Sequence, residues 1–217
     1  YGKLGNLTMT KEGINVLMTN LTGKVPPILQ RLDYIRFNGE AAGYLHDLTL
    51  TGLFHTGAGM VKTDVMMSID EQSMSRTYSG SVASADLDLG KLLNQEKKFG
   101  KVDFNVELKG FNYKNRYPES YIKGIISSFE YSQYQYENIM LDGVYKDGGF
   151  NGRLSMDDAN GSVQIDGNFN VAKTIPDFNL KASVKNLRPH DLHLSDKYEN
   201  ASISLGLTAD FTGKSDR

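Results

Sequence analysis

The sequence predicts an all-β fold, because apolar residues recur at every second position along most of the chain. In the clearest run, Val102, Phe104, Val106 and Leu108 alternate with polar residues. A period of two places the apolar members on one face of a strand and the polar members on the other. Similar phrases, each closed by a glycine, return at 48–52, 139–143, 163–167 and 203–206. The chain is therefore expected to form a long sheet with one apolar face.

Turn sequences separate the alternating runs and favour a continuous antiparallel meander. Asn38-Gly39, Asn160-Gly161 and the 147–149 run Asp-Gly-Gly are expected to supply the positive φ angles of tight hairpins. The expected strands cover roughly 14–22, 35–42, 45–54, 60–70, 77–86, 101–111, 121–131, 133–146, 149–156, 162–171, 178–186 and 201–212.

Three short stretches interrupt the alternation and are expected to form brief helical turns between strands. They cover residues 26–32, 87–93 and 187–194. The first begins with two prolines, which the first turn of a helix tolerates. None is long enough to build a helical layer, so the sequence predicts one elongated β domain over residues 1–217.

Composition narrows the classes of function. The net charge is −2, with 24 basic residues dispersed among 26 acidic ones, and no basic stripe indicates a nucleic-acid partner. Cysteine is absent, which excludes disulfides and thiolate metal sites. No apolar run has the length of a membrane span. The chain begins with Tyr1 rather than Met, and we interpret it as an internal segment of a larger protein.

The alternation identifies the side chains of the apolar face. The candidates are Val61, Val65, Met67, Ile69, Val102, Phe104, Val106, Leu108, Val163, Ile165, Phe169, Phe178, Leu180, Val184, Ile203, Leu205 and Leu207. Taken alone, the pattern favours an ordinary closed core, with two sheets packed face to face. Periodicity identifies the apolar side of a strand but not what covers it.

Longer phrases resemble the AsmA/TamB family of cell-envelope proteins, in the style of its Bacteroidetes TamB-like branch. They are FNGEAAGYLHDLTLTGLFHTGAGMVKTD at 37–64, YSGSVASADLDLGKLL at 78–93, GKVDF at 100–104 and FNLKASVKNLRPHDL at 178–192. The resemblance rests on the order and combination of these phrases, and it extends over most of the chain. It favours an uncovered apolar face over the closed core.

The resemblance implies a fold and a function. Family members fold a long sheet lengthwise into an open trough, the β-taco, which is apolar inside and polar outside. Full-length members are anchored in the inner membrane and cross the periplasm. They are implicated in phospholipid transport to the outer membrane and, as part of the translocation and assembly module, in outer-membrane protein assembly with a barrel partner. For this chain we expect a periplasmic hydrophobic groove for acyl chains, with any barrel partner contacting regions outside it.

Local motifs carry weaker signals. His190 and His193 have the spacing of a zinc pair, with Asp191 and Asp196 nearby, but a third ligand is not compellingly placed. The 157–161 run Asp-Asp-Ala-Asn-Gly lacks the spacing of a calcium loop and predicts a hairpin turn. No catalytic motif is present, so we expect neither an enzyme nor a cofactor.

Tyrosines provide the alternative function. They cluster at Tyr113, Tyr117, Tyr121, Tyr131, Tyr134 and Tyr136. A flat aromatic surface on a secreted β-sandwich is suited to binding glycans. Cross-strand aromatic pairing, which stabilises sheets, is the more ordinary explanation.

Overall fold

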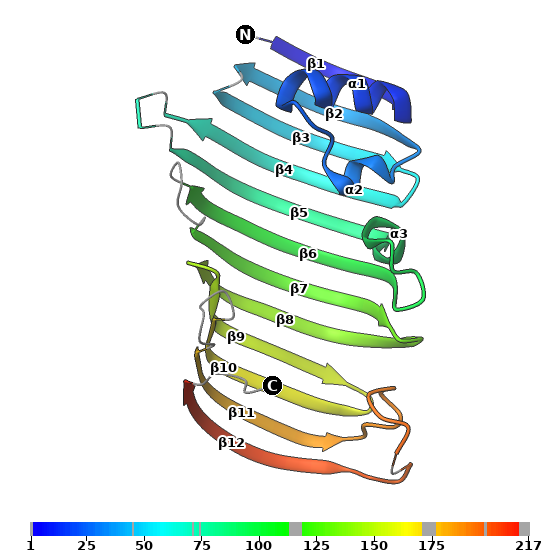
Figure 1. Cartoon of the computed structure of the whole chain (residues 1–217), viewed down its shortest axis with the longest axis vertical. Coiled ribbons are helices and arrows are strands. Elements are labelled where there is room, and N and C mark those ends of the chain that lie inside the picture. Colours follow the sequence, from blue (N-terminus) through cyan, green and yellow to red (C-terminus); the bar gives the residue numbers. More distant parts are fainter. Residues whose placement is uncertain are drawn as a thin grey trace.

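The computed structural model describes residues 2–44, 46–70, 72–73, 75–112, 119–170, 177–197 and 199–212. Within them, twelve strands form one antiparallel sheet whose strand order follows the chain from β1 to β12. The sheet is curved and open, and its first and last strands lie at opposite ends (Figure 1). The predicted all-β, open and mostly antiparallel fold is therefore confirmed.

Each strand pairs with its neighbours in the sequence. The strands are β1 (Gly2–Thr10), β2 (Tyr34–Tyr44), β3 (Asp47–Thr56), β4 (Gly59–Ile69), β5 (Arg76–Asp88), β6 (Phe99–Asn112), β7 (Glu119–Tyr131), β8 (Tyr134–Lys146), β9 (Gly149–Asp158), β10 (Gly161–Asn170), β11 (Asp177–Leu187) and β12 (Ile203–Thr212). All but the first of the expected strands are present, displaced by a few residues at their ends. The β-sandwich of the alternative prediction is wrong for the described residues, because they form a single sheet.

Three short helices lie on one face of the sheet, towards one end of the strands (Figure 1). They are α1 (Lys11–Thr22), α2 (Pro27–Gln30) and α3 (Leu89–Leu93). The expected helical turns at 26–32 and 87–93 are thus confirmed as α2 and α3. In the described part of the chain, no helix is long and apolar enough to cross a membrane.

The expected strand at 14–22 is wrong, because these residues belong to α1. Thr10 caps the helix, its hydroxyl accepting a hydrogen bond from the Gly13 amide at 3.4 Å. Gly23 ends it with a φ of 74°, and its amide donates to the carbonyl of Thr19. Ile14 is 1% exposed, whereas Val16, two residues on, is 62% exposed. The apparent period of two in this segment therefore does not describe its packing.

The Asn38-Gly39 hairpin is also wrong. Both residues lie inside β2, where Gly39 pairs directly with Gly52 of β3. A Cβ atom on Gly39 would lie 2.5 Å from the Cα of Gly52, so this position requires glycine for close backbone approach. The predicted turns at 147–149 and 160–161 are confirmed, and Asp147 and Gly148 have φ angles of 51° and 76°.

Residues 189–193 form consecutive turns rather than the helix expected at 187–194, and Leu187 is the last residue of β11. The amide of Leu192 donates to the carbonyl of Arg188, and the amide of Leu194 donates to that of Pro189. Leu192, which belongs to this segment, is fully buried. The turns therefore act as a short cover over one end of the sheet.

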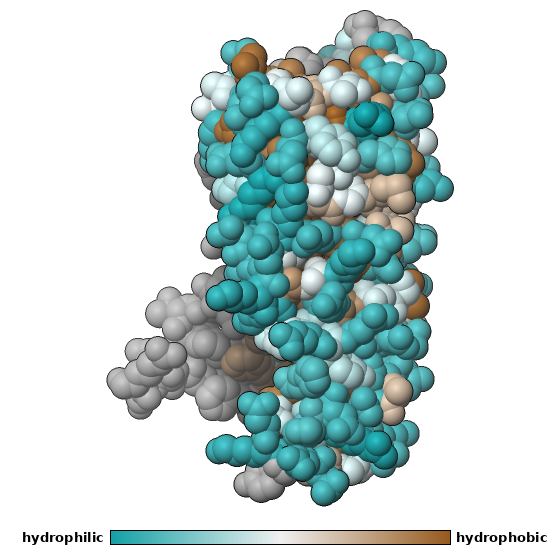
Figure 2. Space-filling model, turned by 90° about the vertical axis from the view of Figure 1, so that its right-hand side faces the viewer, coloured by the Kyte–Doolittle hydropathy of each residue, from teal (hydrophilic) through white to brown (hydrophobic). Residues whose placement is uncertain are grey.

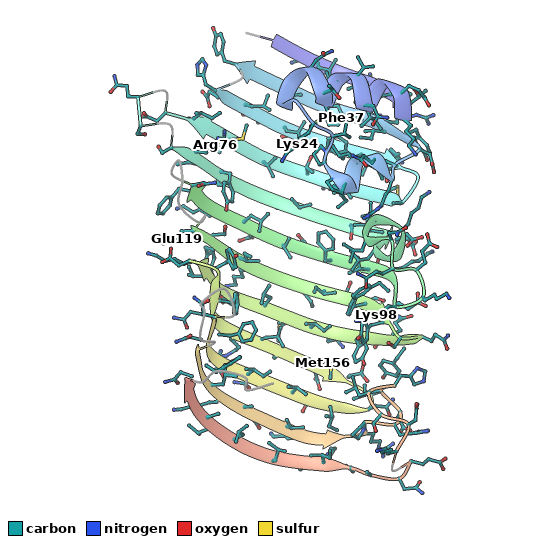
Figure 3. All side chains as sticks on the ribbon, viewed as in Figure 1. Lys24, Phe37, Arg76, Lys98, Glu119 and Met156 are labelled. Carbon is teal, nitrogen blue, oxygen red and sulfur yellow. The ribbon has the colours of Figure 1, made fainter. Side chains whose placement is uncertain are left out.

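The core lies where the helices meet the sheet. Its buried residues are Ile14, Leu32, Ile35, Ala58, Leu87, Leu92 and Val102. Arg31 donates a hydrogen bond to the carbonyl of Leu92, which ties the end of α2 to α3. Phe37 lies beside α1 and α2, close to this core (Figure 3). Elsewhere, no described residue forms a helix on the sheet.

Candidate functional site

The register places the apolar residues of successive strands directly opposite one another. Paired residues of antiparallel strands project from the same face, so each register row is a line of side chains across the sheet. One row reads Phe54, Val61, Ser84, Phe104, Ile126, Ile139, Met156, Val163, Val184 and Leu205. The next reads Gly52, Thr63, Val82, Val106, Gly124, Leu141, Leu154, Ile165, Ala182 and Leu207.

All the predicted apolar residues project from this one face, which we call the apolar face. Val65 and Leu108 both pair with Gly80, so they belong to a third row. Met67 pairs with Tyr78, and Phe169 pairs with Phe178, in a fourth. Each remaining candidate lies an even number of residues along its strand from a residue of these rows, so it projects from the same face. The predicted residues therefore all belong to this face, but the members from β3, β7, β8 and β9 and the cover of the face were not predicted.

One part of the apolar face, which we call the covered end, is buried. It lies beneath the helices and the 188–195 segment. Ile35, Phe37, Leu87, Val102 and Tyr136 are all less than a tenth exposed there. The predicted groove residue Val102 is thus a core residue, 6% exposed and in contact with the cluster around α3.

The rest, which we call the open part, is lined by Val65, Val82, Val106, Leu108, Ile122, Leu141, Leu154, Ile165, Leu180 and Leu207. None of these side chains is buried. The exposed fraction is 37% for Leu154 and 53% for Leu207, and Phe169 on the same face is 42% exposed. No second layer of described residues packs on them. The open part is therefore a continuous apolar surface that extends from β4 to β12.

Glycines occupy apolar-face positions in the open part. Gly143, Gly152 and Gly167 lie opposite one another on β8, β9 and β10, inside the strands and not at their ends. The glycine that closes each repeated phrase of the sequence therefore does not mark the end of a strand. A Cβ atom on Gly143 would lie 2.4 Å from Cζ of Phe150, so the aromatic ring occupies the space that the glycine leaves. The glycines form a notch that neighbouring rings partly fill.

The opposite face carries a row of alternating charges. This row crosses β6 to β11, one residue from each strand, and consists of Glu107, Lys123, Asp142, Arg153, Asp166 and Lys181. Arg153 Nε lies 2.6 Å from Asp166 Oδ1, and Lys123 Nζ lies 3.8 Å from Asp142 Oδ2. Hydrogen bonds from Gln164 and Arg153 lower the pKa of Asp166. Exposed pairs contribute little stability individually, but opposite charges favour this register.

Two shallow hollows also lie on this polar side, and the sequence did not predict them. One, of about 500 Å³, is lined by Met66, Lys109, Phe111 and Tyr121, among others. The other, of about 520 Å³, includes Ile125 and Met140 beside the charged row. The sequence contains one indication of these hollows. Apolar residues such as Met66 and Met140 stand at positions where the alternation would place polar side chains.

The strand ends differ from the faces. Figure 2 shows the side that carries α2 and α3, where hydrophilic side chains predominate and hydrophobic ones are scattered. Lys98 lies at this end, whereas Arg76 and Glu119 lie at the opposite ends of their strands (Figure 3). Charged residues therefore occupy both margins of the sheet.

The tyrosine surface proposed for glycans is largely internal. Tyr134 and Tyr136 share a face, as predicted, with ring centroids 4.8 Å apart. Tyr136 is 7% exposed and its hydroxyl donates to the carbonyl of Leu192 at 2.7 Å. Tyr131 pairs with Tyr134 across the hairpin. Glycan binding stays a prediction that no contact favours.

The other tyrosines do not join this group. Tyr113 and Tyr117 lie outside the described residues, and Tyr121 projects from the polar face, where its hydroxyl donates to Asp142 at 2.9 Å.

Burial, followed by the hydrogen bond to Asp158, raises the pKa of Tyr134 to about 12. This hydroxyl is thus engaged within the fold.

The suspected metal ligands are engaged in local structure. Nδ1 of His193 lies 2.9 Å from the carbonyl oxygen of Ser132, and Nδ1 of His190 lies 3.6 Å from Asp191. Asp158 accepts a hydrogen bond from the amide of Asn160, as in the hairpin turn predicted there. Within the described ranges, no group of three His, Cys, Asp or Glu residues is arranged to hold a metal ion.

Comparisons with protein-family models, with curated proteins and with solved structures find no match to this chain. Arguments about function therefore depend on the two faces of the sheet.

Proposed function

We propose that this chain is a periplasmic segment of a TamB/AsmA-like cell-envelope protein, and that its open part shelters phospholipid acyl chains in transit between membranes. The supporting observation is the series of apolar rows that crosses β4 to β12 without a covering layer. A surface of this kind contacts hydrocarbon along its whole length and needs no catalytic residue.

The energetics suit this role. Each methylene removed from water contributes about 0.8 kcal/mol, so a chain of about sixteen carbons faces a barrier of roughly 12 kcal/mol when it crosses water alone. A continuous apolar surface lowers the barrier at every point of the path. Strands are spaced about 4.8 Å apart, so twelve of them span roughly 55–60 Å. This exceeds the hydrocarbon core of one bilayer, about 30 Å, and favours a conduit over a single pocket.

The proposal extends to the whole protein in the form that the family resemblance implies. The complete chain would be held at the inner membrane by an anchor outside this segment. A role in outer-membrane protein assembly would use a barrel partner that contacts other regions. The segment itself would supply the hydrophobic groove.

Photo-crosslinking tests the orientation of the lipid. A photoreactive amino acid replaces Val106 or Ile165 on the open part, and Glu107 on the polar face serves as the matched position one residue away. In cells that produce the full-length protein, we expect lipid adducts at the first two positions and few at the third. Equal labelling at all three positions would reject the proposal.

A charge on the open part tests transport itself. Val106→Asp is expected to reduce lipid labelling at Ile165 by about tenfold or more, because an unpaired carboxylate on an apolar surface excludes hydrocarbon. Asn105→Asp places the same charge on the exposed polar face and serves as the control. Circular dichroism of both variants establishes that the sheet is retained. Undiminished labelling in folded Val106→Asp would count against the groove.

A further inference from the structure

The open part changes in character towards the margin at which Arg76 and Glu119 lie (Figure 3). On β6 the face is apolar from Val102 to Leu108. Beyond these positions, the fourth register row on β4 to β8 reads Met67, Tyr78, Gly110, Ser120 and Tyr145. On β9, β10 and β11 the same row continues with Phe150, Phe169 and Phe178. Hydroxyl groups therefore line the margin of the face on β5, β7 and β8, and we call Tyr78, Ser120 and Tyr145 the hydroxyl row.

The side chain of Tyr78 crosses a neighbouring strand to complete this row. A Cβ atom on Gly110 of β6 would lie 2.6 Å from Oη of Tyr78, so the tyrosine lies over the glycine. The Tyr78 hydroxyl forms a hydrogen bond with the hydroxyl of Ser120 on β7. Two hydroxyl groups joined by one hydrogen bond retain one O–H donor. The hydroxyl of Tyr145, the register partner of Ser120, has no partner among the described residues. The hydroxyl row thus has donors available to a ligand.

A cation follows the hydroxyl row at the same margin. Arg76 lies two residues beyond Tyr78 on β5, so it projects from the same face, and it pairs in register with Ile69. Arg76 is exposed, and no described residue forms an ion pair or a hydrogen bond with its guanidinium. Two other charges of this margin, Glu119 and Lys146, pair with each other at 2.7 Å. The face of β5 therefore passes from apolar residues through a hydroxyl to an available cation.

We infer that this margin receives the polar end of an anionic phospholipid, with the phosphate at Arg76 and the ester carbonyl oxygens at the hydroxyl row. The groups along the face follow the order of the groups in the lipid, which is hydrocarbon, ester and phosphate. A guanidinium binds phosphate oxygens through charge-assisted hydrogen bonds, and O–H donors suit carbonyl oxygens. The inference rests on the proposed function, because it orients the lipid that the open part shelters.

The depth of the face suits this orientation. Val102 lies eight residues before Gly110 on β6, a distance of about 26 Å at about 3.3 Å per residue. One leaflet contributes about 15 Å to the hydrocarbon core of a bilayer. An acyl chain that begins at the hydroxyl row therefore ends on the apolar rows, before the covered end where Val102 is buried. The reverse orientation would place a charged phosphate beside the core, which is unfavourable.

Lipid selection by the whole chain tests the role of the cation. A photoreactive amino acid at Val106 captures lipid from vesicles that contain equal amounts of dioleoylphosphatidylglycerol and dioleoylphosphatidylcholine, and mass spectrometry identifies the adducts. We expect phosphatidylglycerol to be favoured about threefold, because exposed ion pairs are weak and the choline ammonium would lie beside Arg76. Arg76→Gln should return the adducts to the vesicle composition, whereas Arg76→Lys should retain part of the preference.

Lys62→Gln is the matched control for this selection. It removes the same charge from an exposed position on the polar face of β4 and should keep the preference. Adducts in the vesicle ratio without any charge substitution would overturn this inference and leave the proposed groove in place. The absence of adducts would overturn both. Equal loss of preference in Lys62→Gln and Arg76→Gln would show that the overall charge, and not Arg76, selects the lipid, and would also overturn the inference.

Photoreactive lipids test the orientation independently, since they require no substitution in the protein. A phosphatidylglycerol with a diazirine at its glycerol end is expected to label Tyr78 and Ser120. The same lipid with the diazirine at the tip of an acyl chain should instead label Val106 and Leu141, which lie in the second register row. Labelling of the same residues by both lipids, or the reverse pattern, would overturn the orientation.

Discussion

The covered end and the open part of the apolar face are built from the same kinds of side chain, yet only the covered end is buried. Phe37 is 3% exposed beneath the helices, whereas Phe169, on the same face of a distant strand, is 42% exposed. The difference comes from three short helices and one series of turns. A face defined by alternation can thus be buried core in one place and exposed apolar surface in another.

This contrast separates a region that stabilises the fold from a region for which we propose a binding function. A fully buried aliphatic side chain contributes about 1.5–3 kcal/mol, so the covered end supplies most of the tertiary packing. The open part depends more on backbone pairing and on contacts between neighbouring side chains. Substitutions in the two regions should therefore differ in their effects.

The largest expected effect is at the covered end. Ile14→Ala should lower the free energy of unfolding by about 2–5 kcal/mol, because Ile14 is 1% exposed in the core. The matched Ile165→Ala, in the open part, should lower it by only about 1 kcal/mol. Chemical denaturation measures both. Equal losses would show that the open part is packed as tightly as the covered end.

A second comparison tests the glycine notch. Gly143→Ala should cost about 1–3 kcal/mol, because the new Cβ would meet Cζ of Phe150 at 2.4 Å. Gly206→Ala on β12 is the control, since a Cβ there has no heavy atom within 4 Å. Thermal denaturation should separate the two variants. A stable Gly143→Ala protein would show that the Phe150 ring and the backbone carbonyl oxygen of Asn151, 2.6 Å from the new Cβ, both move aside freely.

A smaller effect is expected where the turns join the sheet. Tyr136→Phe removes the hydrogen bond to the carbonyl of Leu192 and should cost about 0.5–1.5 kcal/mol. Hydrogen exchange should accelerate at Leu192 and Leu194 before it changes elsewhere. Tyr145→Phe is the control, because the hydroxyl of Tyr145 has no partner among the described residues. Unchanged exchange in Tyr136→Phe would contradict the anchoring role.

The smallest effect is electrostatic. Lys91 of α3 donates a hydrogen bond to Asp33 at 2.7 Å, which lowers the pKa of that carboxyl. A lowered folded-state pKa stabilises the protein above the unfolded-state pKa, and this stabilisation disappears as the pH falls through the folded value. In an NMR titration, Lys91→Met should return the pKa of Asp33 towards its ordinary value.

Asp70 is the internal control for that titration. Hydrogen bonds from Ser73 lower its pKa, so its titration should be the same in both proteins. If the pKa of Asp33 also stayed unchanged in Lys91→Met, the link between α3 and the start of β2 would have no electrostatic role.

Alternation was enough to predict most of the sheet. In β6, the polar residues Asp103, Asn105 and Glu107 separate the apolar ones so regularly that strand, face and approximate ends follow directly. The meander followed from the short turns between runs. The membership of the apolar face was therefore predictable from single strands, without knowledge of their partners.

The rest depended on tertiary contacts that a local pattern does not contain. Ile14 and Met18 share a helical face by their spacing of four, but Val16 between them imitates a strand. β1 was missed because its bulge interrupts the alternation. The burial of Val102 was not predictable either, because α3 covers this residue only by packing on β6 in the folded protein.

The strict neighbour-to-neighbour pairing of the meander also affects how such a protein changes in length. Every described strand contacts only those beside it in the sequence, as in a repeat protein, so local segments can form before distant ones meet. Insertion or loss of a whole hairpin would lengthen or shorten the sheet by about 10 Å and leave every remaining strand with its original direction. The span of such a molecule can thus be adjusted in evolution two strands at a time.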